Sequence, residues 1–257
     1  GSLAWKGLFE RLARKYGGDY KKAFAFFLDQ NSYDVRHSVT MLVYARFMKK
    51  LALKLGYNEE DAHMVFLLIC AFGKYILKME GNFFLVGTGL TSGRIDTLVA
   101  NCMISKICMY FAYLLAGHED PKENLDLTNT GDDNITVPAP GCPVTGEELQ
   151  RGQGVLGYVV TASDKSPTIK REPLLAGDYL KRTAYERGNW LMAPLAMKSI
   201  LKSLCYCVGV APKDEGPRNF SALCSATREL WMHPEPVWAK YYPRFVELAK
   251  RYSDKPL

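Results

Sequence analysis

The chain has few of the residues that build zinc-bound or disulfide-linked domains. Its 257 residues include seven cysteines and four histidines. The cysteine number is odd, no two cysteines stand in CxxC spacing, and no histidine stands at ligand spacing from them. This pattern disfavours both a structural zinc site and a disulfide framework. We therefore expect reduced, mostly buried thiols and an intracellular compartment.

Long hydrophobic runs, internal repeats and low-complexity segments are also missing. No uninterrupted apolar run reaches the roughly 18 residues that a membrane span needs. The first residues, GSLAWKG, lack the basic-then-apolar layout of a secretory signal. Hydrophobic residues make up 48% of the chain and charged residues 23%, values typical of a globular protein rather than a disordered one. The length allows one large domain or two compact ones.

Charge is present but unevenly distributed. Residues 1–160 carry 17 basic and 17 acidic side chains, whereas residues 161–257 carry 16 basic and 10 acidic ones. The net charge of +6 therefore lies in the last third. A basic surface of this kind suits a polyanionic partner, although a basic C-terminal third is also common in proteins that bind none.

Periodicity and turn residues predict the following elements in chain order: a helix over 2–16, a buried strand over 23–29, helices over 35–54 and 59–76, a hairpin over 75–87 turned at Gly81-Asn82, a helix over 93–115, a hairpin around Gly131, a helix opened by the Thr145–Glu148 capping box, and a strand over 158–161. From about Asn189 the pattern predicts helices and no strand. The order indicates an α+β domain followed by an α-helical one.

The stretch LTNTGDDNITV, residues 127–137, places two adjacent aspartates at the tip of a predicted hairpin. Asp and Gly are ordinary turn residues, so a solvated turn would account for this stretch alone. Asp29, however, closes the buried strand AFAFFL. If that strand lies beside the hairpin, Asp29 and Asp132 converge at one end of a sheet. Convergent carboxylates suit Mg²⁺, and a pair of such ions serves nucleotidyl transfer.

Five segments resemble, in the same order, motifs A to E of viral RNA-dependent RNA polymerases of the picornavirus-like superfamily: LDQNSYDVRHS (28–38), LTSGRIDTLVAN (90–101), TGDDN (130–134), YVVTASDKS (158–166) and YLKR (179–182). The resemblance implies a polymerase palm over residues 1–188, an antiparallel sheet flanked by helices, and a helical thumb over 189–257. Because only 28 residues precede Asp29, the fingers region that precedes motif A in this superfamily is expected to be missing or truncated.

The resemblance also implies roles for individual residues. Asp29 and Asp132 would hold two Mg²⁺ ions, for which Mn²⁺ can substitute, with Asp133 as auxiliary ligand and Lys165 as general acid or charge clamp toward pyrophosphate. Nucleotide binding is expected at Asp34, Ser92, Gly93, Thr97 and Asn101, with Asp34 sensing the ribose 2′-hydroxyl. Lys181 and Arg182 would contact the RNA backbone.

Simpler interpretations exist for several of these residues. Thr97 and Asn101 are four apart, so on a helix they share one face, as ordinary polar surface residues also do. Lys165 stands before Ser-Pro and, taken alone, would be a surface lysine. Lys181 and Arg182 on a hairpin could simply be solvated. The motifs favour the chemical interpretation because they occur together and in order.

The expected function is that of an RNA-directed RNA polymerase core from a positive-strand RNA virus, which adds NTPs to an RNA 3′ end on an RNA template. Expected partners are template and primer RNA, NTPs, and other viral replication proteins or a chain that supplies the fingers, in host cytoplasmic replication complexes. One alternative is a non-catalytic RNA-binding or scaffold fragment. A reverse-transcriptase-like palm is disfavoured, because that family usually places an aromatic residue where a 2′-hydroxyl would clash.

Overall fold

The computed structural model describes residues 2–31, 33, 36–37, 39–86, 90, 96–205 and 215–252. Their contacts divide the chain into two compact units. The sheet unit comprises Leu12–Leu174, and the C-terminal unit comprises Leu175–Leu257 together with Gly1–Arg11. The palm–thumb boundary expected after residue 188 stays a prediction, since the units follow contacts and not function.

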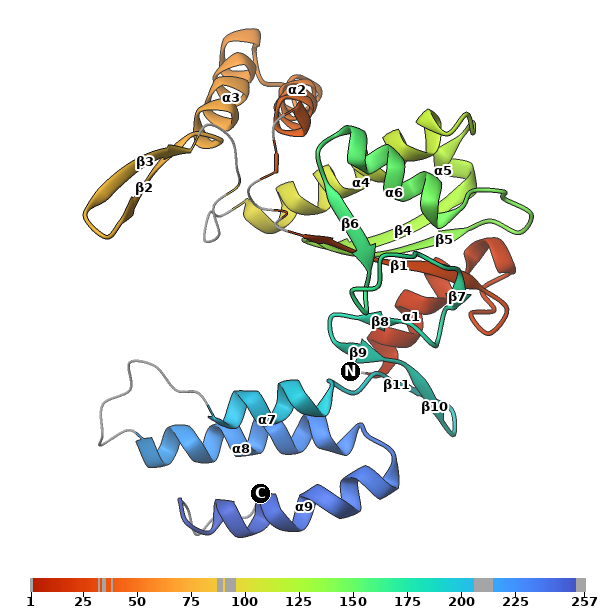
Figure 1. Ribbon diagram of the computed structural model, residues 1–257, viewed down its shortest axis with the longest axis vertical. Coiled ribbons are helices and arrows are strands. Elements are labelled where there is room, and N and C mark those ends of the chain that lie inside the picture. The colour runs from red at the N-terminus through yellow and green to blue at the C-terminus, as the bar shows by residue number, and fades with distance from the viewer. Residues whose placement is uncertain are drawn as a thin grey trace. The chain divides into compact units, whose positions relative to one another are not determined.

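An antiparallel sheet is the centre of the sheet unit (Figure 1). Its strands are β1 (Phe24–Asn31), β4 (Leu125–Thr130), β5 (Asp133–Pro138) and β6 (Val159–Ala162), in the order β4-β5-β1-β6, with the short β7 (Glu172–Pro173) paired to the start of β1. Strand β1 is buried over most of its length, as its continuous apolar run predicts. The predicted strand is confirmed.

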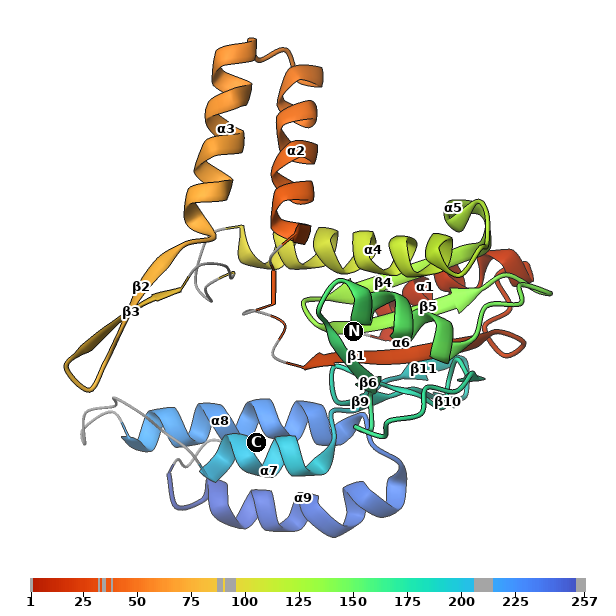
Figure 2. The ribbon, with the colours of Figure 1, turned by 45° about the horizontal axis from the view of Figure 1, so that its top comes forward.

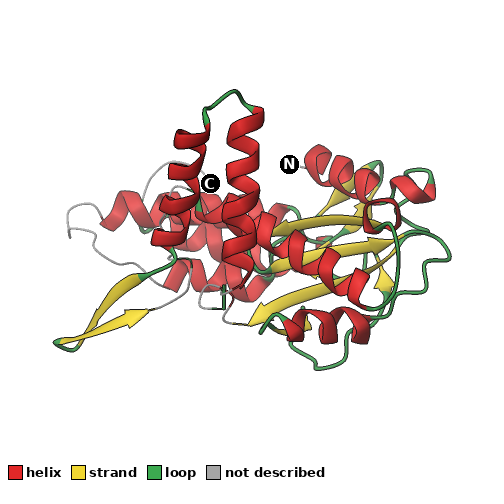
Figure 3. Ribbon diagram, turned by 90° about the horizontal axis from the view of Figure 1, so that it is seen from above, coloured by secondary structure: helices red, strands yellow, loops and turns green. Residues whose placement is uncertain are grey.

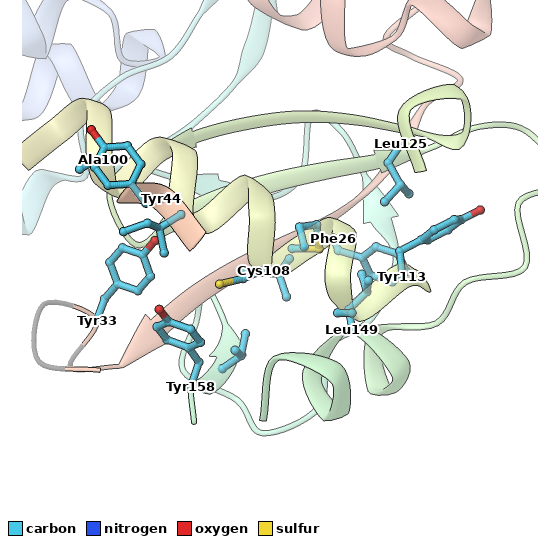
Figure 4. Close-up of a cluster of buried hydrophobic side chains, with 14 of the residues drawn as sticks. Phe26, Tyr33, Tyr44, Ala100, Cys108, Tyr113, Leu125, Leu149 and Tyr158 are labelled. Carbon is cyan, nitrogen blue, oxygen red and sulfur yellow. The ribbon is translucent and has the colours of Figure 1, made fainter. Parts of the chain in front are cut away.

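Two helices, α4 (Thr97–Leu115) and α6 (Gly146–Val155), pack on this sheet, and Figure 3 shows helices lying across its strands. The hydrophobic core lies between these helices and the sheet; Phe26 of β1, Cys108 of α4 and Leu149 of α6 meet there (Figure 4). The predicted capping box at the start of α6 is confirmed. The short helix α5 (Pro121–Asn124) precedes β4.

Helix α4 is also the one helix in the described part of the chain that is long and apolar enough to cross a membrane, with a mean hydropathy of 1.6 over its most apolar window. Ala100, Ile104, Cys108 and Ala112 of this helix belong to the buried core. Length and composition of this kind are shared by the core helices of many globular proteins. The pattern is therefore weak evidence for a span.

An inserted segment between β1 and α4 consists of α2 (Val39–Lys54), α3 (Glu59–Phe72) and a hairpin of β2 (Tyr75–Met79) with β3 (Asn82–Val86). Figure 2 shows α2 and α3 side by side, projecting from the sheet. The hairpin turns at Glu80-Gly81, with φ of +50° and +83°, and not at Gly81-Asn82 as predicted. Two consecutive positive φ values give the turn that matches the twist of paired strands, so the register moves by one residue.

The C-terminal unit contains helix α1 (Ser2–Leu12, of which Leu12 belongs to the sheet unit), the hairpin β8 (Asp178–Tyr179) with β9 (Arg182–Thr183), the hairpin β10 (Tyr185–Arg187) with β11 (Trp190–Met192), and helices α7 (Met197–Cys205), α8 (Glu215–Trp231) and α9 (Glu235–Ala249). Ile200, Leu230 and Phe245 form the core of its helices. Strand β11 corrects the prediction that no strand follows Asn189; three residues are too few for a periodicity to show.

The cysteines are less uniformly buried than expected. Cys108 and Cys142 are buried, but Cys205 is exposed at the end of α7.

The short 3-10 helix Arg14–Tyr16 belongs to the sheet unit, where the Arg14 Nε donates to the buried Asp126 carboxylate at 2.6 Å. This contact holds the segment that precedes β1 against the start of β4.

Candidate functional site

Two carboxylates from different strands face each other across the sheet. Strand β1 pairs with β5 in a register that puts Asp29 directly opposite Asp133. Directly opposed side chains project from the same face, with Cβ atoms about 4.5–5.5 Å apart. Asp29 is 6% exposed and Asp133 is half-buried. The sequence predicts Asp132 as the main partner of Asp29, and this stays a prediction; the register shows that Asp133 is the residue directly opposite Asp29.

These carboxylates lie on the face of the sheet away from α4 and α6. Leu28 belongs to the hydrophobic core, and Gln30 donates a hydrogen bond to Gln153 of α6. Because successive side chains of a strand alternate between faces, Asp29 projects to the opposite side from both neighbours. The helices therefore support the site from behind and leave the carboxylates on the other face.

Asp132 lies in the two-residue turn that joins β4 to β5. Gly131 precedes it with φ of +67°, a conformation that glycine adopts without steric cost and that a tight hairpin needs at this position. Asp132 is exposed, and Asp133 begins β5 opposite Thr130. The turn thus holds one solvated carboxylate directly beside the facing pair.

Lys165 reaches the same place from strand β6. Thr161 of β6 lies opposite Asp29, and a turn closed by the Lys165 N–H on the Ala162 carbonyl at 2.8 Å follows that strand. The Lys165 ammonium donates to the Asp29 carboxylate and lies 3.4 Å from Oδ1 of Asn31. Its φ of +70° is unusual for a residue with a side chain. The structure therefore joins two predicted site residues that are far apart in the sequence.

Helix α4 contributes Thr97 and Asn101, which share one face of its first turns. Asn101 is half-buried, and its side-chain oxygen is buried without a hydrogen-bond partner in the described part of the protein. Such an acceptor suits a donor from a ligand. Asp34, Ser92 and Gly93, the other expected nucleotide-binding residues, lie outside the described residues.

Two residues that sequence reasoning missed connect these parts. The Tyr33 hydroxyl donates to the main-chain carbonyl of Asn101 at 2.8 Å. Asn129 of β4 donates through Nδ2 to the carbonyl of Cys102 at 2.5 Å. Asn is depleted in strands, so Asn129 carried a signal that could have been read; Tyr33 carried none, since an aromatic residue there looks like core.

Burial keeps the tyrosines beneath α4 neutral. It raises the pKa of Tyr33 far above its usual value, with smaller contributions from Cys108 and Tyr158. Burial also raises the pKa of Tyr158, and it raises the pKa of the Cys108 thiol to about 12. Each group is therefore protonated at neutral pH, and the Tyr33 hydroxyl is available as a donor.

The carboxylates at the ends of β1 and β5 offer oxygen ligands for a metal ion. Among the described residues, no group of three or more His, Cys, Asp or Glu side chains forms a metal-binding cluster. Mg²⁺ needs only one or two carboxylates, because water and substrate phosphates complete its shell. The facing pair of Asp29 and Asp133 supplies that number of hard oxygen donors, and Asp132 is adjacent. The donor chemistry therefore fits Mg²⁺ or Mn²⁺.

Lys181 and Arg182 belong to the C-terminal unit. Leu180 and Lys181 form the turn of the β8–β9 hairpin with φ of +55° and +60°, and Lys181 is exposed. The Arg182 guanidinium makes two hydrogen bonds to Glu229 of α8, at 2.7 and 2.8 Å, and one to the Ala193 carbonyl at 2.8 Å. Lys181 is thus free to meet solvent, whereas Arg182 is held within the protein.

Comparison with known proteins adds to this geometry. A sequence model described as viral RNA-dependent RNA polymerase matches residues 2–227. The fold is similar to that of the Sicinivirus 3Dpol RNA-dependent RNA polymerase, with a TM-score of 0.74 at 15% sequence identity. The match covers 98% of this chain and 52% of the Sicinivirus chain, so this chain spans about half the length of that polymerase. A search of curated proteins found no significant match.

The family match covers most of the chain and contains all five segments that carry the sequence resemblance. The solved structure supports the same fold, and at 15% identity it supports the fold alone. The antiparallel sheet with its flanking helices is the α+β arrangement that the resemblance predicts. The chain belongs to the viral RNA-dependent RNA polymerase family.

Proposed function

We propose that this chain is the catalytic core of an RNA-directed RNA polymerase that extends an RNA primer on an RNA template. The observation that carries the proposal is the site on one face of the sheet, where Asp29 lies opposite Asp133 and contacts Lys165. Membership of the family supports the same reaction. This chain spans about half of the Sicinivirus polymerase, so polymerase activity is proposed for it and does not follow from that similarity.

In this proposal Asp29, Asp132 and Asp133 hold two Mg²⁺ ions. When bound, such ions activate the primer 3′-hydroxyl and stabilise the charge that develops on the phosphates. Lys165 has a flexible stem and three donors, so its ammonium can turn from Asp29 toward the leaving pyrophosphate. There it would give up a proton or stay as a positive clamp.

Nucleotide selection falls to the residues at the start of α4 and after β1. Asn101 offers a buried acceptor that has no hydrogen-bond partner among the described residues, and Thr97 lies one turn earlier on the same face. With Asp34 they would bind the ribose 2′-hydroxyl, and Ser92 and Gly93 would shape the same pocket. A site that needs this hydroxyl rejects a deoxynucleotide because its buried polar groups stay unpaired.

The RNA contact that we propose in the C-terminal unit is made by Lys181, whose exposed ammonium can approach a phosphate. The sequence predicts an RNA contact for Arg182 as well. In this proposal Arg182 supports the contact of Lys181, because its ion pair with Glu229 holds the β8–β9 hairpin in place. The setting we propose is a positive-strand RNA virus replicating in the host cytoplasm. Further viral replication proteins, or a chain that supplies the fingers, would act as partners there.

A non-catalytic RNA-binding fragment is the second candidate, and the concentration of positive charge in residues 161–257 favours it. That function would require none of the aspartates. It predicts RNA binding that weakens steeply with salt and does not respond to Asp132→Asn.

Primer extension on a short RNA primer–template with Mg²⁺ or Mn²⁺ tests the proposal, using wild type, Asp132→Asn and Lys165→Gln. Extension by wild type, abolished in Asp132→Asn and slowed about 10²-fold or more in Lys165→Gln, supports the polymerase. Lys170→Gln, an exposed lysine nearby in the chain, is the matched control. Salt-sensitive RNA binding without extension, and without metal binding that depends on Asp132, would favour the binding fragment.

A further inference from the structure

Two consecutive main-chain carbonyls of helix α4 receive hydrogen bonds from the two segments that carry the acidic residues. Asn101 O accepts from Tyr33, which follows β1 and precedes Asp34 in the chain. Cys102 O accepts from Asn129, which lies in β4 three residues before Asp132. We propose that this turn of α4 is a common anchor, and that Tyr33 and Asn129 are positioning residues that fix Asn101 relative to the two segments that carry the acidic residues.

The Tyr33 side chain is held so that its hydroxyl has one place to go. Tyr33 is 3% exposed, and its ring packs edge-on against His37 with centroids 4.4 Å apart and beside Tyr158 at 5.5 Å. Figure 4 shows Tyr33 and Tyr158 on the same side of α4. A ring fixed by such packing loses little further freedom when its hydroxyl binds, so the hydrogen bond to Asn101 O can act as a specific tether.

Asn129 forms a reciprocal contact. Its side-chain amide donates to the main-chain carbonyl of Cys102 at 2.5 Å, and its main-chain carbonyl accepts from the Cys102 thiol at 3.3 Å. The residue opposite Asn129 in the hairpin register is Asn134, so the contact lies one pair before the last pair, Thr130 with Asp133, at the turn. The tip that carries Asp132 and Asp133 is thus attached to α4 and does not depend on the two strands alone.

The two acceptors follow each other in the helix and are separated by about 1.5 Å along its axis. Each carbonyl has a second lone pair, so it can accept these bonds besides the one within the helix. A displacement of either acidic segment would therefore pull on the same turn. Asn101 belongs to that turn, and the buried oxygen of its side chain has no partner within the described residues.

This arrangement would act on selectivity more than on the carboxylates themselves. The inference rests on the proposed polymerase function, in which Asn101 contacts the ribose. Removing one tether leaves every proposed metal ligand and Asn101 itself in place. It changes how precisely the Asn101 amide is held, and a contact to one hydroxyl depends on that precision.

The test is equilibrium dialysis of the full chain with labelled ATP and 2′-deoxy-ATP in the presence of Mn²⁺. Tyr33→Phe and Asn129→Ala each remove one tether. Tyr110→Phe on the same helix and Asn124→Ala, which loses side-chain bonds to the Glu119 and Asp120 carbonyls, are matched controls. We expect each tether variant to lower the preference for ATP roughly two- to ten-fold, mainly through weaker ATP binding, and the controls to keep it.

A second arm uses the Asn101→Ala background. If the tethers act through Asn101, Tyr33→Phe causes no further loss of preference there, whereas a general loss of stability would add to it. A wild-type preference retained in Tyr33→Phe and Asn129→Ala, while Asp132→Asn still abolishes Mn²⁺-dependent ATP binding, overturns the anchor and leaves the polymerase proposal standing. Equal binding of ATP by wild type and Asp132→Asn overturns both.

Discussion

Asp29 and Asp133 lie directly opposite each other in neighbouring strands, so two carboxylates project from one face of the sheet. Like charges in this position repel and destabilise a sheet. The Lys165 ammonium contacts one of them and offsets part of the repulsion. A divalent ion bound to the pair would offset it further.

We therefore expect Mg²⁺ or Mn²⁺ to raise the melting temperature of wild type and to leave that of Asp133→Asn unchanged. A ligand present at 100 times its Kd stabilises a folded protein by about 2.7 kcal/mol. Asp120→Asn is the control, because Asp120 is exposed and its φ of +52° is one that Asn tolerates. Thermal unfolding with and without the ion measures the effect. The same metal-induced shift in Asp133→Asn would contradict the pairing as a metal site.

We expect substitution of Arg182 to affect the stability of the protein and substitution of Lys181 to affect RNA binding. Arg182→Gln removes the bonds to Glu229, and we expect it to destabilise the protein by about 1–3 kcal/mol in urea unfolding. Lys181→Gln should leave stability unchanged, weaken RNA binding, and lower the slope of log affinity against log salt by about 1. Fluorescence anisotropy at several salt concentrations measures that slope. Weak RNA binding by an Arg182→Gln protein of wild-type stability would reverse these assignments.

The contact between α4 and α6 depends on a glycine. A Cβ atom at Gly152 would lie 2.5 Å from Cα of Ala112, whereas one at Gly154 would meet nothing within 4 Å. We expect Gly152→Ala to cost about 1–3 kcal/mol of unfolding free energy through overpacking. Gly154→Ala should instead stabilise the helix by about 0.5–1 kcal/mol. Urea unfolding of the two variants checks both signs, and equal effects would mean that the helices do not approach this closely.

The capping box of α6 predicts a dependence on pH. The Thr145 backbone N–H, and then His118, lower the pKa of Glu148 below its ordinary value. The carboxylate therefore contributes stability above that ordinary value, and the contribution is lost as the pH falls through the folded pKa. Glu148→Gln should be less stable by about 1 kcal/mol at neutral pH, with the difference disappearing in acid. Unfolding between pH 3 and pH 7 measures this difference, with the exposed Glu147→Gln as control; a difference that persists in acid would exclude the carboxylate as its source.

Local elements were largely predictable from the sequence, because their causes lie within a few residues. The run AFAFFLD predicted a buried strand, Thr145 with Glu148 predicted a helix start, and the residues around Gly131 predicted a hairpin; the structure contains all three. The shift of the β2–β3 turn by one residue and the missed β11 have the opposite cause. Turn register and very short strands depend on which strand lies beside them, and periodicity does not reveal a neighbour.

The sequence by itself determined the family and the residue types of the site, since motifs A to E can be recognised in order along the chain. Only the tertiary structure decided which of those residues meet. Strand register placed Asp133 opposite Asp29, the turn after β6 brought Lys165 to Asp29, and α8 gave Arg182 an acidic partner. Tyr33 and Asn129 meet α4 only in the folded chain, and no sequence pattern marks these contacts because their acceptors are backbone carbonyls, which every residue has. Pairing between distant segments is set by the packing of the whole core, which no local pattern encodes.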